Sequence, residues 1–105
     1  QREMASKRMM AEVPTADVVV TNPTHLAVAL RYQRGEDAAP RVVAKGAGFV
    51  AQRIKEIARK HQVPVIENPP VARLLHNKVE IGGIIPEELF RAVAEILAHV
   101  YALKN

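Results

Sequence analysis

The residues Asn22, Pro23, Thr24 and His25 carry the most distinctive chemistry in this chain of 105 residues. Proline has no backbone N–H, so the usual deamidation of asparagine, in which the following backbone nitrogen attacks the side chain, is closed at Asn22. The reverse attack stays open, because the side-chain nitrogen of Asn22 can attack its own main-chain carbonyl carbon. That reaction would close a succinimide ring, expel the nitrogen of Pro23 and break the peptide bond between the two residues.

The unaided cyclisation is very slow, because an amide nitrogen is a poor nucleophile. Bringing it from years to minutes needs an acceleration of about 10⁵- to 10⁶-fold, equivalent to about 7–8 kcal/mol. A held near-attack geometry can supply much of this, and an acid must help the proline nitrogen to leave. The first and fourth residues of a β-turn lie within about 7 Å, so the turn carries the imidazole of His25 to the reacting atoms.

A purely structural role for the same turn is the alternative. Pro23 suits the second position of a type I or II turn, with Asn22 folded back on the backbone as an Asx turn. Two-residue hairpins favour primed turns, which need a positive φ that proline cannot adopt. We therefore expect a corner that splays the flanking strands instead of closing a hairpin, and for an isolated Asn-Pro pair this role is the commoner one.

The chain contains a second Asn-Pro pair, Asn68-Pro69, which serves as an internal control. No histidine follows it, and Asn68 suits the N-cap of a short helix whose first turn holds Pro69 and Pro70. We predict no cleavage at this pair.

The elements that must position the turn are predicted from changes in hydrophobic period. Short apolar runs predict four strands, at 17–21, 26–32, 41–46 and 64–67, and helical spacing predicts helices at 1–12, 47–62, 70–78 and 86–103. The strand, helix and strand between 41 and 67 favour a right-handed parallel crossover. The expected fold is α/β: a mixed sheet of about four strands flanked by about four helices, in a single compact domain with an N-terminal helical arm.

Composition limits the function further. Apolar residues make up 49% of the chain, so it should fold, and it contains no cysteine for a disulfide or thiolate site. No apolar run reaches the length of a membrane span, which predicts a soluble chain. Lys and Arg outnumber Asp and Glu by 15 to 11, but only two Tyr and two Phe are present and none interleaves with a basic run. That argues against nucleic acid and favours a simple solvated basic surface, while an acidic partner or an acidic membrane surface stays open.

Other candidate sites are weaker. His61, His76 and His99 share no ligand spacing with one another or with His25, so we predict no metal. The glycines of residues 45–48 lack the full phosphate-binding pattern and indicate a tight strand-to-helix turn, so no cofactor is expected.

The last helix is apolar on nearly all sides. One stripe can face the core (Leu89, Val93, Ile96, Val100 and Leu103), and a second lies beside it (Phe90, Ala94, Leu97 and Tyr101). Burial of both stripes is slightly favoured. The alternative is a partly exposed groove for binding partners, with the loop residues Ala38, Ala39 and Pro40 as its other wall.

The run "VVVTNPTHLAVALRY" strongly resembles the FlhB/YscU family of self-cleaving export-switch proteins of type III secretion. The resemblance continues through "PRVVAKGAGFVAQRIKEIA", "VPVIENPPVARLLH" and "VEIGGIIPEELFRAVAEILAHVYALK". The stretches "AVALRY" and "EILAHVY" look flagellar more than injectisome-like. Two departures, Leu26 where an aromatic residue is common and Gly83-Ile84 where a polar pair is common, leave the chemistry of the turn untouched.

The resemblance implies a cytoplasmic domain at residues 14–105, joined by a linker arm at 1–13 to an absent membrane domain, at the cytoplasmic face of the bacterial inner membrane. It implies a single-turnover cleavage between Asn22 and Pro23, with Thr24 and His25 completing the motif, after which the pieces stay together and export changes from early to late substrates. The domain would not act as an enzyme on other molecules.

The partners that the resemblance implies are the protein's own membrane domain, other export-apparatus proteins, and rod, hook-type and length-control substrates. The groove beside the last helix, with Ala39, Pro40, Ala94 and Leu97, is the candidate docking site for such substrates. The competing hypothesis is a binding module of the export gate that is never cleaved.

Overall fold

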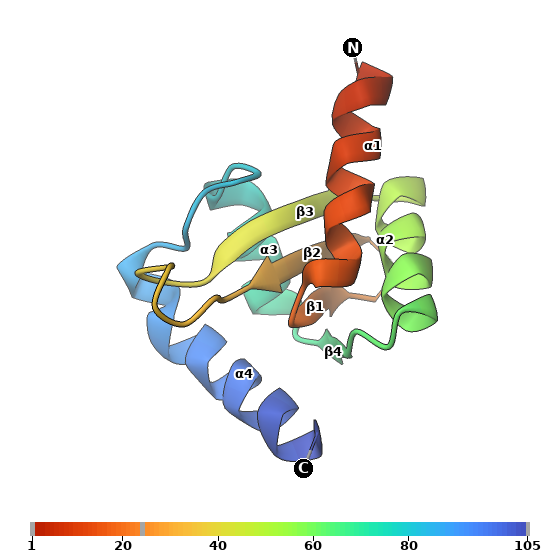
Figure 1. Ribbon diagram of the computed structural model, residues 1–105. Helices are drawn as coiled ribbons and strands as arrows, with labels where there is room; N and C mark the ends of the chain where they lie inside the picture. The colour runs from red at the N-terminus through yellow and green to blue at the C-terminus, as the bar shows by residue number, and fades with distance from the viewer. Residues whose placement is uncertain (1, 24, 105) are drawn as a thin grey trace.

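The computed structural model describes the backbone of residues 2–23 and 25–104 and the side chains of residues 7–23 and 25–103. Figure 1 shows four strands and the helices around them. Their order is α1 (Arg2–Glu12), a 3-10 helix η1 (Val13–Thr15), β1 (Val18–Asn22), β2 (Leu26–Arg31), β3 (Arg41–Ala47), α2 (Phe49–Lys60), β4 (Val65–Glu67), α3 (Pro69–Lys78), a 3-10 helix η2 (Glu87–Leu89) and α4 (Phe90–Lys104). The predicted α/β class, four-stranded mixed sheet and four flanking helices are confirmed.

The four strands form one sheet in the order β3-β2-β1-β4. β2 runs antiparallel to both of its neighbours, β1 and β3, whereas β4 lies parallel to β1. β3 and β4 therefore run in the same direction, as the predicted crossover requires, but β2 and β1 lie between them. β1 is an interior strand of the sheet, and it leads directly into the Asn-Pro turn.

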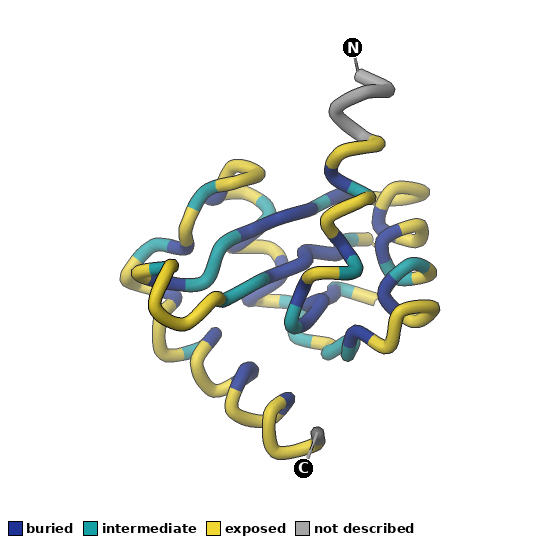
Figure 2. The backbone as a smooth tube through the Cα atoms, viewed as in Figure 1, coloured by how far each residue is buried: buried dark blue, intermediate teal, exposed yellow. Residues whose placement is uncertain are grey.

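Helices cover both faces of the sheet, which explains why the strands are apolar without alternation. One face packs against α3 and α4, with Val18, Val20 and Leu30 among its fully buried residues. The other face packs against α2, η1 and the end of α1, and buries Val19 and Ala29. Figure 2 shows the buried backbone concentrated in the sheet and along the inner side of each helix.

The N-terminal helix extends away from the domain, with the chain's start and end at opposite ends of the molecule (Figure 1). Its C-terminal end is nevertheless part of the domain, because Met9 is buried together with Val13 of η1 in the core between the sheet and α2. In the part of the chain that is described, no helix combines the length and apolar character needed to cross a bilayer.

The expectation that the Asn-Pro turn would splay its flanking strands is wrong. β1 and β2 pair as an antiparallel hairpin in continuous register from Val18 opposite Leu30 to Asn22 opposite Leu26. Pro23 to His25 thus form a three-residue connection, and the extra residue relieves the conflict between proline and the primed two-residue turns. The hairpin closes because both strands are buried on two faces, which outweighs the preference of the turn.

The tight connection predicted between β3 and α2 is confirmed, with Gly48 as the only residue between them. Gly48 has φ of 57° and ψ of −125°, which few side chains tolerate. Gly46 allows the helix to approach closely, because a Cβ at this position would lie 2.1 Å from Cγ1 of Val50.

The slightly favoured burial of both apolar stripes of α4 is wrong. Leu97 of the second stripe is buried, but Phe90 and Tyr101 are 43% and 36% exposed, and Ala94 is exposed as well. Leu103, which was expected to face the core, is 64% exposed, because the described part of α4 is buried only as far as Val100.

Candidate functional site

The turn at residues 22–25 closes through a backbone hydrogen bond. The N–H of His25 donates to the carbonyl oxygen of Asn22 over 2.9 Å, the bond between first and fourth residues that defines a closed β-turn. The acceptor is the same carbonyl whose carbon would be attacked by the Asn22 side chain. The structure thus brings Asn22, Pro23 and His25 together at the tip of one hairpin, whereas Thr24 lies outside the described residues.

The tip of the hairpin is accessible although its base is fixed. Asn22 is half-buried, and Pro23 and His25 are exposed. One residue earlier, Thr21 is only 3% exposed, and its hydroxyl lies 3.5 Å from the carbonyl oxygen of Ile66. A rigid pair of buried strands therefore presents the Asn22–Pro23 bond to solvent.

Two residues from the region of α2 hold the loop from outside. The N–H of Gly48 donates to the carbonyl oxygen of His25 over 3.0 Å, and Nζ of Lys55 donates to the carbonyl oxygen of Pro23 over 2.8 Å. Neither contact follows from the sequence pattern. Lys55 lies on the polar side of a helical pattern, and only the packing of α2 beside the hairpin brings it to the loop.

The arrangement can favour an attack on the carbonyl carbon of Asn22. A backbone N–H aimed at a carbonyl oxygen polarises the C=O bond and stabilises the negative charge that develops there. The group that would leave is the secondary amine of Pro23. Because Pro23 has no backbone N–H, the competing deamidation of Asn22 is closed. The geometry is consistent with cyclisation and does not require a bound group.

The second Asn-Pro pair lies next to the first but in a different environment. The backbone N–H of Asn68 donates to the carbonyl oxygen of Thr21 over 2.9 Å. The side-chain oxygen of Asn68 accepts the N–H of Val71 at 3.3 Å, so the predicted N-cap of α3 is confirmed. Its side chain is thereby engaged with the helix start and not with its own carbonyl.

The four predicted docking residues lie around one surface cavity between α4 and the loop before β3. Ala39 and Leu97 are buried, Pro40 is half-buried and Ala94 is exposed. The cavity measures about 280 Å³ and is lined by Tyr32, Ala38, Ala39, Pro40, Phe90, Ala94 and Leu97. It is mostly apolar, and Phe90, Ala94 and Leu97 from the second stripe of α4 form one of its walls.

An acidic side chain fixes the loop that carries Ala39 and Pro40. The carboxylate of Asp37 accepts the backbone N–H of Gln33 at 2.9 Å and lies 3.3 Å from Nη2 of Arg41. The Gln33 N–H, and after it the Arg41 guanidinium, hold the pKa of the Asp37 carboxyl below its ordinary value, against the opposing effect of burial. The guanidinium of Arg41 also donates to the carbonyl oxygen of Gly82, which ties this loop to the one before α4.

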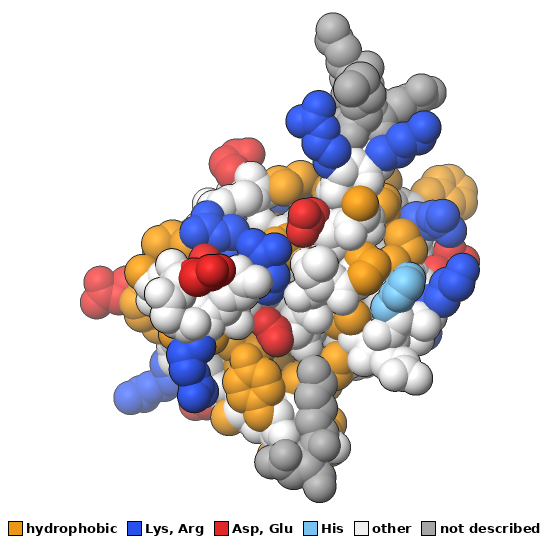
Figure 3. Space-filling model, viewed as in Figure 1, with side chains coloured by type: hydrophobic (Ala, Val, Ile, Leu, Met, Phe, Trp, Pro, Cys, Tyr) orange, Lys and Arg blue, Asp and Glu red, His pale blue; other side chains and the backbone are white. Residues whose placement is uncertain are grey.

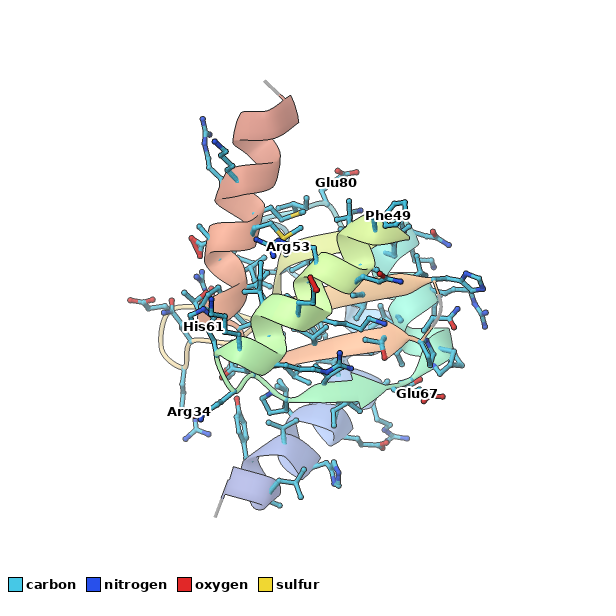
Figure 4. All side chains as sticks on the ribbon, turned by 90° about the vertical axis from the view of Figure 1, so that its right-hand side faces the viewer. Arg34, Phe49, Arg53, His61, Glu67 and Glu80 are labelled. Carbon is cyan, nitrogen blue, oxygen red and sulfur yellow. The ribbon has the colours of Figure 1, made fainter. Side chains whose placement is uncertain are left out.

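A larger cavity of about 660 Å³ lies between α1 and α2, on a side of the domain that the sequence analysis did not consider. Figure 3 shows hydrophobic side chains between Lys and Arg side chains there, and Figure 4 shows Arg53 on the side of α2 that faces α1. The residues that line this larger cavity are Lys7, Met10, Ala11, Pro14, Arg53, Glu56, Ile57, Lys60 and His61. Among the described residues, no three acidic or histidine side chains cluster closely enough to hold a metal ion.

Comparison with known proteins relates this fold and turn to one family. The family model described as "FlhB HrpN YscU SpaS Family" matches residues 1–100. The flagellar biosynthetic protein FlhB is 57% identical over 105 residues in Salmonella typhimurium and 54% identical over 105 residues in Bacillus subtilis, covering the whole of this chain in both. The chain spans 27% and 29% of the lengths of these two relatives.

Solved structures agree with this relationship. The cytoplasmic domain of FlhB from Shewanella putrefaciens matches with a TM-score of 0.91 and 46% identity, over 94% of this chain and 76% of that one. A mutated EscU C-terminal domain matches with a TM-score of 0.84 and 33% identity, over 88% of this chain and 92% of that one. The fold is that of the FlhB cytoplasmic domain and the EscU C-terminal domain. The chain belongs to the FlhB, HrpN, YscU and SpaS family, which confirms the resemblance drawn from its sequence.

Proposed function

We propose that this chain is the cytoplasmic domain of a flagellar or related type III export component that cleaves itself once, between Asn22 and Pro23, and thereby changes which substrates are exported. The hydrogen bond from the N–H of His25 to the carbonyl oxygen of Asn22, at 2.9 Å, carries the proposal. It supports attack on this carbonyl because it both closes the turn and polarises the reacting bond.

The proposed step needs no reagent other than the chain itself. The side-chain nitrogen of Asn22 bonds to the main-chain carbonyl carbon of the same residue and gives up a proton. The bond from that carbon to the nitrogen of Pro23 breaks, and this nitrogen takes up a proton. The products are a fragment 1–22 that ends in a succinimide and a fragment that begins at Pro23. The exposed imidazole of His25 is the candidate proton carrier, and each chain reacts only once.

Cleavage would change the tip of the hairpin in shape and charge. Hydrolysis of the succinimide gives Asn22 a carboxylate, and Pro23 gains an amine that is protonated at neutral pH. Because β1 and β2 are paired up to Asn22 and Leu26, the change stays local. A partner that recognises this corner would distinguish the cleaved from the uncleaved domain.

The cavity bounded by Ala39, Pro40, Ala94 and Leu97 is the proposed docking site for export substrates. Its apolar lining and the exposed stripe of α4 support this role, since exposed apolar patches commonly mark protein contacts. In the whole protein, the domain would lie at the cytoplasmic face of the inner membrane, with α1 leading from the membrane domain to the sheet.

Mass spectrometry of the purified chain tests the proposal against the alternative of an uncleaved binding module. Self-cleavage predicts two fragments under denaturing conditions, 1–22 and a second beginning at Pro23, in the wild type and none in Asn22→Ala. A wild-type chain that stays whole after prolonged incubation would contradict cleavage and favour the binding module.

A further inference from the structure

We infer that Lys55 is a positioning residue for the cleavage: its ammonium group holds the carbonyl of Pro23 and fixes the leaving half of the scissile bond against α2. The inference rests on the self-cleavage proposed above and adds a residue to that site. It starts from the 2.8 Å hydrogen bond between Nζ of Lys55 and the carbonyl oxygen of Pro23.

The loop is held through the residues on either side of position 24. Lys55 binds the carbonyl of Pro23, and the N–H of Gly48 binds the carbonyl of His25 over 3.0 Å. Both anchors come from α2 or the residue before it, so the loop is attached to one element. Figure 4 shows Phe49, the first residue of α2, and Glu67, the last of β4, on the side of the domain where β1 ends, opposite His61 and Arg34.

The helix that carries Lys55 is a rigid support. Its neighbour Ile54 and the residue Ala58 are fully buried against the sheet, and Ala51 is 3% exposed. Lys55 itself is half-buried, so its aliphatic stem packs while its ammonium group reaches outwards to the loop. A charged donor on a fixed helix restricts the loop more than a donor on a loosely packed segment would.

The contact restrains the torsion that the proline ring leaves free. The ring fixes φ of Pro23, but the direction of the Pro23 carbonyl depends on ψ. A hydrogen bond from a charged donor is stronger than a neutral one, and it selects one value of ψ. Holding reacting groups in a near-attack geometry is a large source of rate, and small misplacements are costly.

Cleavage itself weakens the same contact. The new amine of Pro23 is protonated at neutral pH and belongs to the residue whose carbonyl Lys55 binds. Two positive groups then lie close together and repel each other. Lys55 thus holds the loop before the reaction and favours its release afterwards.

The test compares cleavage rates of the wild type, Lys55→Met, Lys55→Arg and Lys60→Met by mass spectrometry. Methionine keeps the length of the stem but removes the donor, and we expect cleavage to slow by about fivefold or more. Arginine keeps a charged donor and should restore at least half of the lost rate. Lys60→Met removes the same charge from an exposed position of the same helix and should cleave like the wild type.

A structural readout separates positioning from a general loss of stability. In the uncleaved Asn22→Ala background, Lys55→Met should shift the Pro23 carbonyl and His25 amide signals in NMR while leaving the signals of the buried strands in place. If the wild type cleaves and Lys55→Met cleaves at the same rate, the inference is overturned while the proposed function stands. The same holds if Lys60→Met slows cleavage as much as Lys55→Met does. A wild type that does not cleave would instead overturn the proposed function.

Discussion

The backbone N–H of Asn68 donates to the carbonyl oxygen of Thr21 over 2.9 Å, so the two Asn-Pro pairs of the chain lie beside each other. They differ in what surrounds the asparagine. Asn22 is at the tip of a closed turn with His25 as its fourth residue, whereas the side chain of Asn68 caps α3. We therefore expect local geometry, and not the Asn-Pro sequence alone, to decide which of the two pairs is cleaved.

Substitution of Asn68 by alanine should cost stability but not change cleavage. The variant loses the 3.3 Å hydrogen bond to the N–H of Val71, and removal of such a cap typically costs about 1 kcal/mol. Urea denaturation of the uncleaved Asn22→Ala background measures the loss, and mass spectrometry follows cleavage in the otherwise wild-type chain. Appearance of a fragment that begins at Pro69 would show that the capping geometry does not protect this pair.

The two fragments should remain together after cleavage. Fragment 1–22 contributes β1, which is paired to β2 on one side and to β4 on the other. Val18, Val19 and Val20 are fully buried, and cutting the hairpin tip removes none of these contacts. Gel filtration of the cleaved protein should give one species in plain buffer and separate fragments only in denaturant. Resolution into two species under native conditions would contradict this expectation.

Lys45 should be important for stability and not for cleavage. Its Nζ donates to the carbonyl oxygens of His76 and Val79, each over 2.8 Å, and so satisfies the C-terminal end of α3. Hydrogen bonds to a charged group contribute about 1.5–3 kcal/mol, so Lys45→Met should lower the free energy of unfolding by about this amount. The matched control is Lys60→Met on the exposed side of α2. If this variant loses as much free energy of unfolding as Lys45→Met, a specific role of the contact with α3 is ruled out.

The contribution of the Asp37 carboxylate to the stability of the domain should be lost in acid. The pKa of its carboxyl is lowered from 3.8 in the folded state, chiefly by the N–H of Gln33. The ionised form is therefore favoured by folding, and its contribution is complete above pH 3.8 and is lost as the pH falls through the lower folded value. Asp37→Asn should be less stable than the wild type at pH 7, with a difference that shrinks below pH 3.8. A difference that stays constant over this range would contradict the assignment.

Most of the fold could be predicted from the sequence because its elements differ clearly in period. The buried run before Asn22 predicts β1, and the spacing of Ile54 and Ile57 predicts α2. The order of the strands in the sheet could not be predicted from the sequence, because the placement of β4 beside β1 depends on contacts between distant segments. The sequence wrongly predicted a splayed corner in place of the closed hairpin for a similar reason. Burial of both strands on two faces outweighs the preference of a proline turn.

The candidate site was only partly accessible to sequence reasoning. Asn22, Pro23 and His25 are adjacent in the chain, and the chemistry of the first two follows from the residues themselves. Lys55 is 30 or more residues away, and its 2.8 Å contact with Pro23 exists only because α2 packs beside the hairpin. The exposure of Phe90 and Tyr101 depends likewise on how α4 packs against distant segments of the chain.

The central claim is that the bond after Asn22 breaks by cyclisation of this residue, and the mass of fragment 1–22 at early times tests it most directly. Samples of freshly folded protein would be quenched in acid at intervals and weighed by mass spectrometry, with Asn22→Ala as the control that should give no fragment. Cyclisation predicts a first product one water molecule lighter than a fragment ending in a carboxylate, which later hydrolyses to a mixture of asparagine and isoasparagine ends. A fragment that carries a simple asparagine carboxylate from its first appearance, with no lighter precursor, would contradict the account.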